Sequence, residues 1–260
     1  MFNGLRIGVT GMQTSQKVMD NVADQIANST TGGYKKKEVR FGDLLRNEIS
    51  RSHAAVSENA EGASIGIGSR ALVSKTNFTQ GVLKPSESPF HMAIEGNGFF
   101  GVMTAAGDLL LTRNGAFSMS ADGALTDGEE NGLVYESYVP AGSIGSYDGV
   151  SISENGVISG RNDRGEVIEL GRVALFQPGA EDGLLSLGEN KYFLLEGMGM
   201  ANSIDDAQGF GVIRHKYLEE SNVDIAESMT EMILTQRAYQ LNAKSITTAD
   251  EMLEVINTII

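Results

Sequence analysis

The sequence contains no cysteine among its 260 residues. Disulfide bonds, a thiol nucleophile and thiolate metal sites are therefore excluded together. Long hydrophobic runs are also missing, although 41% of the residues are hydrophobic, so we expect no membrane-spanning helix. The first residues do not combine a basic segment with an apolar core of about 7–15 residues, so we expect no secretory signal.

Positive charge is scarce. Lys and Arg number 20 against 34 Asp and Glu, which gives a formal net charge of −14. An acidic chain repels phosphate groups, so neither nucleic acid nor an anionic membrane surface is an expected partner. The basic run Lys35–Lys37 follows an expected helix. Lysines at this end of a helix interact favourably with the negative end of its dipole.

Signatures of catalysis and cofactor binding are missing or incomplete. The run GNGFFG at residues 96–101 matches the dinucleotide pattern G-x-G-x-x-G, but a predicted hairpin follows where a helix would have to begin. His53, His91 and His215 are isolated, whereas zinc ligands normally cluster. No two carboxylates stand out as a pair for glycoside hydrolysis. We therefore expect no enzyme, no cofactor and no metal site.

Two long helical patterns stand at the ends of the chain. Residues 3–30 and 218–260 carry a seam that alternates steps of four and three, which is typical of a coiled coil. Its positions are Leu5, Val9, Met12, Gln16, Met19, Ala23 and Ile26, then Ile225, Met229, Met232, Gln236, Tyr239, Ala243, Ile246, Asp250, Leu253, Asn257 and Ile260. The alternative is an amphipathic helix packed on its own domain. A helix of about 40 residues exceeds the usual length of about 11–12, which favours assembly with other copies.

The middle of the chain is rich in turn signals and short strands. It accounts for most of the 32 glycines, and Asn-Gly or Asp-Gly pairs end at Gly98, Gly115, Gly123, Gly128, Gly132, Gly149 and Gly156. These pairs suit the positive φ angles of tight turns. Short strands with a turn about every ten residues predict an antiparallel all-β unit.

These patterns predict an α+β chain, in which a central antiparallel all-β body is flanked by long N- and C-terminal helices that pair as a coiled-coil-like unit. The predicted parts are an assembly helix at 1–32, an extended connector at 33–75, a β domain at 76–216 and a second assembly helix at 217–260. Gly32 and Gly33 should end the first helix, and Ser221, Asn222 and Asp224 should begin the second. Frayed ends in the free subunit should let trypsin cut around Lys35–Arg51 and at Arg214 or Lys216, leaving a folded fragment of roughly residues 52–214.

Three stretches carry a resemblance to a known family. They read IANSTTGGYKKK at 26–37, NFTQGVLKPSESPFHMAIEGNGFFGV at 77–102, and KYLEESNVDIAESMTEMILTQRAYQLNAKSITTADEML at 216–253. In this order they resemble the bacterial flagellar rod and hook protein family, the axial components of the basal body. The resemblance covers almost the whole chain, and the layout is most similar to the distal rod members.

The resemblance implies a structural subunit that polymerises into a hollow helical drive shaft, which transmits torque from motor to hook and forms part of the export channel. The implied partners are copies of the chain, adjacent rod and hook proteins and the flagellar type III export apparatus. The implied location is the basal body, in the periplasmic or peptidoglycan-spanning part of the envelope. A proximal rod or hook-type protein is the near alternative, and an unrelated secreted or phage β-structural protein is the alternative of another class.

The resemblance also implies assembly contacts at the positions that match the family's motifs. These are Asn28, Gly33, Tyr34, Lys35, Ser221, Asn222, Val223, Gln236, Arg237, Tyr239 and Asn242. The helical seam adds Leu5, Met12, Met19, Ile26, Met232, Ile246 and Leu253. Residues 46–68 are expected to bridge adjacent subunits and to stiffen the shaft, and the alternative is a disordered surface loop that acts as a passive linker.

Overall fold

A computed structural model describes residues 2–43, 47–48, 64–65, 68–140, 144–162, 164–195, 197–205 and 209–259. Within these residues the chain is α+β, with two long helices and strands that pair antiparallel. It divides into two compact units. Unit 1 contains residues 1–27, 37–76 and 224–260, and unit 2 contains residues 28–36 and 77–223. The predicted bridge at 46–68 lies almost entirely outside the described residues.

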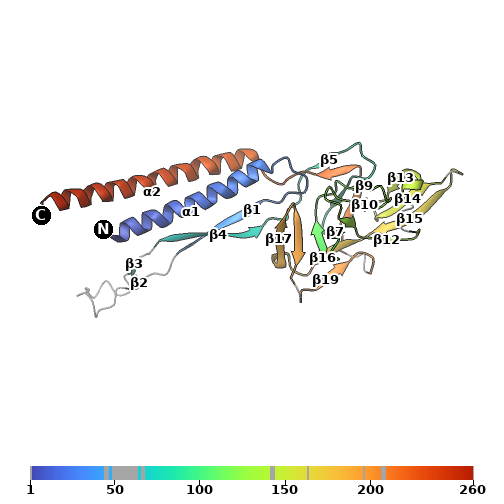
Figure 1. Cartoon of the computed structure of the whole chain (residues 1–260), viewed down its shortest axis with the longest axis horizontal. Coiled ribbons are helices and arrows are strands. Elements are labelled where there is room, and N and C mark those ends of the chain that lie inside the picture. The colour runs from blue at the N-terminus through green and yellow to red at the C-terminus, as the bar shows by residue number, and fades with distance from the viewer. Residues whose placement is uncertain are drawn as a thin grey trace. The chain divides into compact units, whose positions relative to one another are not determined.

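Unit 1 consists of two helices and a long hairpin. Helix α1 spans Phe2–Ala27 and α2 spans Ile225–Ile259. The two helices run side by side in Figure 1. Strands β1 (Lys37–Asp43) and β4 (Ser69–Thr76) pair antiparallel with Phe41 opposite Ala71, and the short β2 (Asn47–Glu48) pairs with β3 (Ser64–Ile65). The described part of the predicted connector is therefore mainly a hairpin.

Both helices are shorter than predicted. Helix α1 ends at Ala27, and the predicted C-terminal glycine Gly33 lies beyond it with φ 71°. Helix α2 begins at Ile225, because the Oδ1 atom of Asp224 accepts hydrogen bonds from the backbone N–H groups of Ala226 at 2.8 Å and Glu227 at 3.1 Å. Residues 217–219, predicted to be helical, form a strand.

The buried face of α1 differs from the predicted seam. On α1 the residues at Gly8, Ser15, Val18, Val22 and Gln25 are buried, whereas the predicted seam positions Val9, Gln16 and Ala23 are exposed. Added Cβ atoms at Gly8 and Gly11 would lie 2.9 Å from Ile246 Cγ1 and 2.7 Å from Asn242 Nδ2. The coiled-coil-like pairing is thus not supported, because Gly8 and Gly11 of α1, which lie outside the predicted seam, face Ile246 and Asn242 of α2.

The core of unit 1 is small. Its buried hydrophobic cluster contains Val18, Val22 and Ala71, with Ile26, Val39 and Met232 packed partly buried against it. The amide Nε2 of Gln25 and Nδ2 of Asn21 both donate to the carbonyl of Lys37, at 2.7 and 3.0 Å. Polar bonds therefore hold the hairpin to α1 beside a minor apolar contact.

Unit 2 is built from antiparallel sheets. A nine-stranded sheet runs in the order β17 (Leu184–Gly188), β18 (Lys191–Leu194), β8 (Leu109–Thr112), β7 (Phe99–Met103), β11 (Gly132–Leu133), β10 (Leu125–Thr126) and β9 (Ser118–Met119), with β16 (Leu175–Pro178) on β7 and β19 (Met200–Asn202) on β16. A four-stranded sheet runs β12 (Tyr135–Ser137), β15 (Val167–Val173), β14 (Val157–Arg161) and β13 (Asp148–Ile152). Unit 2 also contains two separate strand pairs. Strand β6 (Met92–Glu95) pairs with β20 (Val212–His215), and β5 (Leu83–Pro85) pairs with β21 (Tyr217–Glu219). Two short helices complete the unit, η2 (Ile144–Ser146) and η3 (Glu181–Gly183).

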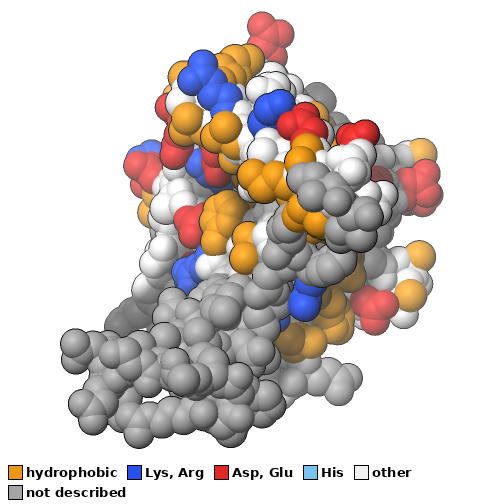
Figure 2. All heavy atoms as spheres, turned by 90° about the vertical axis from the view of Figure 1, so that its left-hand side faces the viewer, with side chains coloured by type: hydrophobic (Ala, Val, Ile, Leu, Met, Phe, Trp, Pro, Cys, Tyr) orange, Lys and Arg blue, Asp and Glu red, His pale blue; other side chains and the backbone are white. Residues whose placement is uncertain are grey.

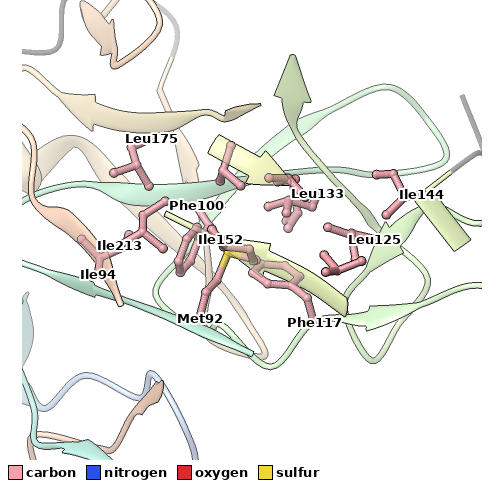
Figure 3. Packing of buried hydrophobic residues seen from close by; sticks show 14 of the residues in the cluster. Met92, Ile94, Phe100, Phe117, Leu125, Leu133, Ile144, Ile152, Leu175 and Ile213 are labelled. Atoms are coloured by element: carbon pink, nitrogen blue, oxygen red, sulfur yellow. The ribbon is translucent and has the colours of Figure 1, made fainter. Parts of the chain in front are cut away.

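The core of unit 2 lies between these strands. Figure 3 shows side chains from strands far apart in the sequence pointing toward one another, with Met92, Phe100 and Phe117 in the middle. The rings of Phe100 and Phe117 meet edge to face with centroids 5.4 Å apart. A second cluster packs Phe99 and Tyr192 around Phe78. The β6–β20 pair brings Ile213 into the same core as Ile94.

The turn prediction is confirmed in part. Gly98, Gly123, Gly149 and Gly156 have positive φ, as expected after Asn or Asp. The other three glycines of such pairs do not. Gly115 is instead required by close packing, since a Cβ atom there would lie 1.5 Å from the carbonyl oxygen of Met92.

Candidate assembly site

The two ends of unit 2 meet in one place. The N–H of Gly33 donates to the carbonyl of Glu219 at 2.8 Å, and the N–H of Asn222 donates to the carbonyl of Tyr34 at 3.4 Å. We call the residues gathered here the junction cluster: Gly33, Tyr34, Lys35, Lys36, Asn77, Thr79, Gly81, Arg113, Glu219 and Asn222. The cluster joins the residues after α1 to those before α2.

The side chain of Asn222 binds two other segments. Its Oδ1 accepts the N–H of Lys36 at 2.7 Å, and its Nδ2 donates to the carbonyls of Asn77 at 2.8 Å and Thr79 at 3.0 Å. The N–H of Asn77 in turn donates to the carbonyl of Lys36 at 2.8 Å. A primary amide, with one acceptor and two donors, can satisfy all these groups at once.

A buried ionic group lies behind Asn222. The ammonium of Lys35 donates to Glu219 Oε1 at 2.6 Å and to the carbonyl of Thr79 at 2.8 Å, and Lys35 and Glu219 are each 1% exposed. The same carboxylate oxygen accepts the N–H of Gly81 at 2.8 Å. Burial lowers the pKa of the Lys35 amine, and the Glu219 carboxylate opposes that change.

A second buried cation completes this group. Arg113 is 4% exposed, its Nη1 lies 3.6 Å from Glu219 Oε2, and its Nη2 donates to the carbonyl of Gly96 at 3.0 Å. Its guanidinium carbon stands 5.1 Å from the centroid of the Phe99 ring. Burial lowers the pKa of Arg113, against the effect of Glu219. One carboxylate therefore compensates two buried cations, and its removal would leave both unpaired.

Two glycines allow the segments to approach. A Cβ atom at Gly33 would lie 2.5 Å from the backbone nitrogen of Asn114, and one at Gly81 would lie 2.0 Å from the carbonyl oxygen of Glu220. Any side chain at either position would push the backbone segments apart. Gly33 also adopts φ 71°, which favours glycine.

The structure brings together some of the motif residues and leaves others apart. Gly33, Tyr34, Lys35 and Asn222 lie in the junction cluster. Asn28, Ser221 and Val223 lie beside it and make local bonds: Thr31 Oγ1 donates to Asn28 Oδ1 at 3.2 Å, and Val223 N–H donates to Ser221 Oγ at 3.3 Å. Contacts from these residues to other copies stay a prediction, because their bonds here are within one chain.

The remaining motif residues belong to α2 in unit 1. Gln236 and Arg237 are exposed, and Tyr239 and Asn242 are half-buried, with Asn242 facing Gly11. The seam residues are all half-buried: Leu5, Met12, Met19, Ile26, Met232, Ile246 and Leu253. None of them is fully covered within the subunit.

Sequence reasoning missed Arg113, Glu219, Gly81, Asn77 and Thr79 as members of the cluster. The signal for Glu219 was weak, since it stands beside Glu220 in a polar run. Arg113 directly follows the apolar strand β8, and such a position for a charged residue hints at a buried partner. Nothing in the spacing could link Arg113 to Glu219.

Helix α2 presents a large uncovered apolar surface. Eight of its large hydrophobic side chains are between 42% and 72% exposed: Ile225, Met229, Ile233, Leu234, Leu241, Met252, Val255 and Ile256. Figure 2 shows hydrophobic side chains reaching the surface between charged ones on the face that it draws. Large apolar side chains left exposed along one helix favour an interaction surface.

Other kinds of site find little support in the described part of the chain. No group of three or more His, Asp or Glu side chains there could hold a metal ion. His91 shares a hydrogen bond of 2.7 Å with Ser86 Oγ, and burial lowers its pKa, whereas His215 Nε2 contacts the carbonyl of Pro89. His53 lies outside the described residues. Among the helices described, none is both long and apolar enough to cross a membrane.

Comparison with family models gives two matches. Residues 214–259 match the C-terminal region of flagellar basal body rod FlgEFG proteins, and residues 93–160 match the D1 domain of the flagellar hook protein FlgE/F/G. The first match contains part of the junction cluster and the whole of α2. The second lies within unit 2.

Curated relatives match over nearly the full length. The chain is 33% identical over 262 residues to the flagellar basal-body rod protein FlgG of Buchnera aphidicola subsp. Baizongia pistaciae, covering 99% of each chain. It is 32% identical to the protein of the same name from Agrobacterium fabrum, covering 97% of each. For the Borreliella burgdorferi protein of that name the identity is 31%, covering 100% of this chain and 99% of the relative.

Proposed function

The chain belongs to the flagellar basal-body rod protein family, as a structural subunit most like the distal rod protein, and from this premise we propose that it polymerises through its terminal helices into a hollow helical shaft. In this proposal the shaft transmits torque from the motor to the hook, and its channel serves export. The proposed partners are further copies, the adjacent rod and hook proteins and the flagellar type III export apparatus. The proposed position is the periplasmic or peptidoglycan-spanning part of the basal body.

The observation that carries the proposal is a second, uncovered stripe on α2. Leu234, Ala238, Leu241, Ser245, Thr248, Met252 and Val255 alternate steps of four and three, and all but the half-buried Thr248 are exposed. The face of α2 that contains Met232, Ile246 and Leu253 is half-buried within the subunit, so this stripe is a separate face. Its spacing is that of a coiled-coil seam. The coiled-coil-like packing would therefore form between copies.

A polar stripe on α2 supports the same arrangement. Arg237, Gln240, Lys244, Thr247, Glu251 and Glu254 also alternate steps of three and four, and every one is exposed. A helix with two covered faces and one polar face suits the wall of a water-filled tube. The polar stripe is the face that the polymer would leave in water.

The interface between copies would be heterologous. Unlike surfaces meet when an uncovered helix face of one copy packs on another part of the next, and a rotation that does not close produces a filament. The family consists of structural rod proteins, so the subunit acts by packing and stiffness rather than by chemistry.

Leu241→Asp tests the proposal. Leu241 is 72% exposed, so the isolated subunit should keep its fold, as measured by circular dichroism. A carboxylate in the covered stripe of the polymer should abolish filament formation, measured by light scattering and electron microscopy, and motility in cells that lack their own copy. Gln240→Asp, on the polar stripe, is the matched control and should assemble. Normal filaments of Leu241→Asp would overturn the proposal.

A further inference from the structure

Unit 2 is connected to the rest of the chain at four peptide bonds, after residues 27, 36, 76 and 223. The connections after residues 36, 76 and 223 are linked to one another by hydrogen bonds. Lys36, Asn77 and Asn222 lie within one residue of them and share a ring of hydrogen bonds at 2.7 to 2.8 Å. A force on any of the three connections therefore reaches the other two directly.

A short path joins the two ends of unit 2. Lys35 and Glu219 are 184 residues apart in the sequence, yet their side chains are 2.6 Å apart and 0% exposed. The backbone bond from Gly33 to Glu219 runs beside them. Most strands of unit 2 lie between Lys35 and Glu219 in the sequence. A force that passes through the bonds between these two residues therefore does not pass through the sheets.

The direction of the two segments determines how a force acts on them. Gly33 bonds to Glu219 and Tyr34 bonds to Asn222, so residue numbers rise along both segments together. Tension toward α1 on one segment and toward α2 on the other makes them slide along each other. All the bonds between them then share the force, and no single bond is opened first.

We propose that residues 33–36 and 219–222 form a mechanical clamp, in which Asn222 and Glu219 carry force between the two ends of unit 2 and shield its sheets from it. The clamp deepens the proposed function, because it rests on the subunit being a part that transmits torque. Asn222 and Glu219 are the positioning residues of this device. The clamp acts through hydrogen bonds and one buried ionic group and needs no ligand.

Single-molecule pulling on the full-length chain tests the clamp. Since the chain has no cysteine, two introduced cysteines define where the handles attach. Ala27→Cys and Ile225→Cys, both at exposed positions, apply force across the clamp. Ala106→Cys and Arg164→Cys, also exposed, apply force to unit 2 by a path outside residues 33–36 and 219–222.

Glu219→Gln and Asn222→Ala are compared with the parent in both pulling directions. We expect each to unfold unit 2 at least about tenfold faster at a given force when pulled from 27 and 225, since each loses buried or charge-assisted hydrogen bonds. Pulled from 106 and 164, the same variants should change by a much smaller factor. Glu220→Gln is the matched control, because the side chain of Glu220 makes an exposed ion pair with Lys84 at 3.3 Å, and the variant should change neither rate.

The possible outcomes separate the clamp from ordinary stabilisation. Equal acceleration in both pulling directions would overturn the clamp and make these residues general stabilising contacts. No acceleration in either direction would overturn it as well. If Glu219→Gln fails to fold, Asn222→Ala decides alone, because Asn222 is only half-buried. The measurement uses isolated subunits, so its failure would leave the polymer proposal standing, and failed polymerisation would leave the clamp standing.

Discussion

Unit 1 and unit 2 differ in how much apolar surface each of them buries. Among the described residues, unit 2 has clusters of 16 and 5 buried hydrophobic residues, whereas the cluster in unit 1 has 3. A fully buried side chain of this kind contributes about 1.5–3 kcal/mol, and ordering each backbone residue costs about 1–2 kcal/mol. In unit 1 the other apolar contacts of the two helices are only partly buried, so each contributes less than a fully buried side chain.

The difference indicates that the units reach stability in different ways. Unit 2 buries its apolar groups within one chain. Unit 1 leaves apolar side chains of α2 in water, where a neighbouring copy can cover them. A subunit built in this way can be folded in its β-body while its helices become fully ordered only in the polymer.

The largest expected contrast lies in protection of the free subunit from proteolysis and hydrogen exchange. Trypsin should cut first at exposed sites in the helices, such as Lys17, Arg237 and Lys244, because local opening of a weakly packed region costs little free energy. Lys35 and Arg113 should resist, since both are buried. Mass spectrometry of the early fragments tests this. Equal protection of α2 and the core of unit 2 in a dilute monomer would remove the contrast.

The structure also changes the trypsin-resistant fragment that is expected from the sequence. A fragment of roughly residues 52–214 would lack both Lys35 and Glu219, and would leave Arg113 without its carboxylate. We therefore expect the resistant material to retain residues 28–36 together with 77–223. A stable fragment that lacks residues 28–36 would show that the junction cluster is dispensable for the fold of unit 2.

An intermediate effect should follow from filling the contact between the helices. In Gly8→Val the new side chain would meet Ile246, because a Cβ atom alone would already lie 2.9 Å from it. Overpacking of this kind typically costs about 1–3 kcal/mol, so the thermal transition of the helices, followed by circular dichroism, should move to lower temperature. The control is Gly4→Ala, with nothing within 4 Å of its Cβ, which should stabilise α1 by about 0.5–1 kcal/mol. The same response from both variants would mean that this contact is loose.

The smallest expected effect is on the free energy of unfolding of unit 2 at acid pH. Burial raises the pKa of Asp127, but hydrogen bonds from Asn131 and Lys191 outweigh it and hold the pKa below its usual value of 3.8. Since the folded pKa is depressed, the stabilisation is present above pH 3.8 and is lost as the pH falls through the folded pKa. We expect Asp127→Asn to flatten this acid dependence by about 1 kcal/mol or less, measured by denaturant unfolding across that range. An unchanged acid slope would show that Asp127 does not titrate with folding.

The sequence alone determined much about the secondary structure. Helices at both ends, strands between them and positive φ at Gly98, Gly123, Gly149 and Gly156 were all predictable, because each depends on residues close together in the chain. The motif stretches likewise pointed to the family and to its role as a rod subunit. Local propensity and spacing were sufficient for the helices, strands and turns, whereas the family was indicated by the resemblance of the motif stretches.

Tertiary structure decided which faces are covered and which charges are buried. The apolar spacing of α1 predicts a contact at Val9 and none at Gly8 or Gly11. A glycine matters here through the residues that pack closely against it, and these are known only from the folded chain. The same limit applies to Glu219, whose burial depends on Lys35 at a distance of 184 residues and on Arg113. A charge can be buried only beside its partner, and only the folded chain brings these partners together.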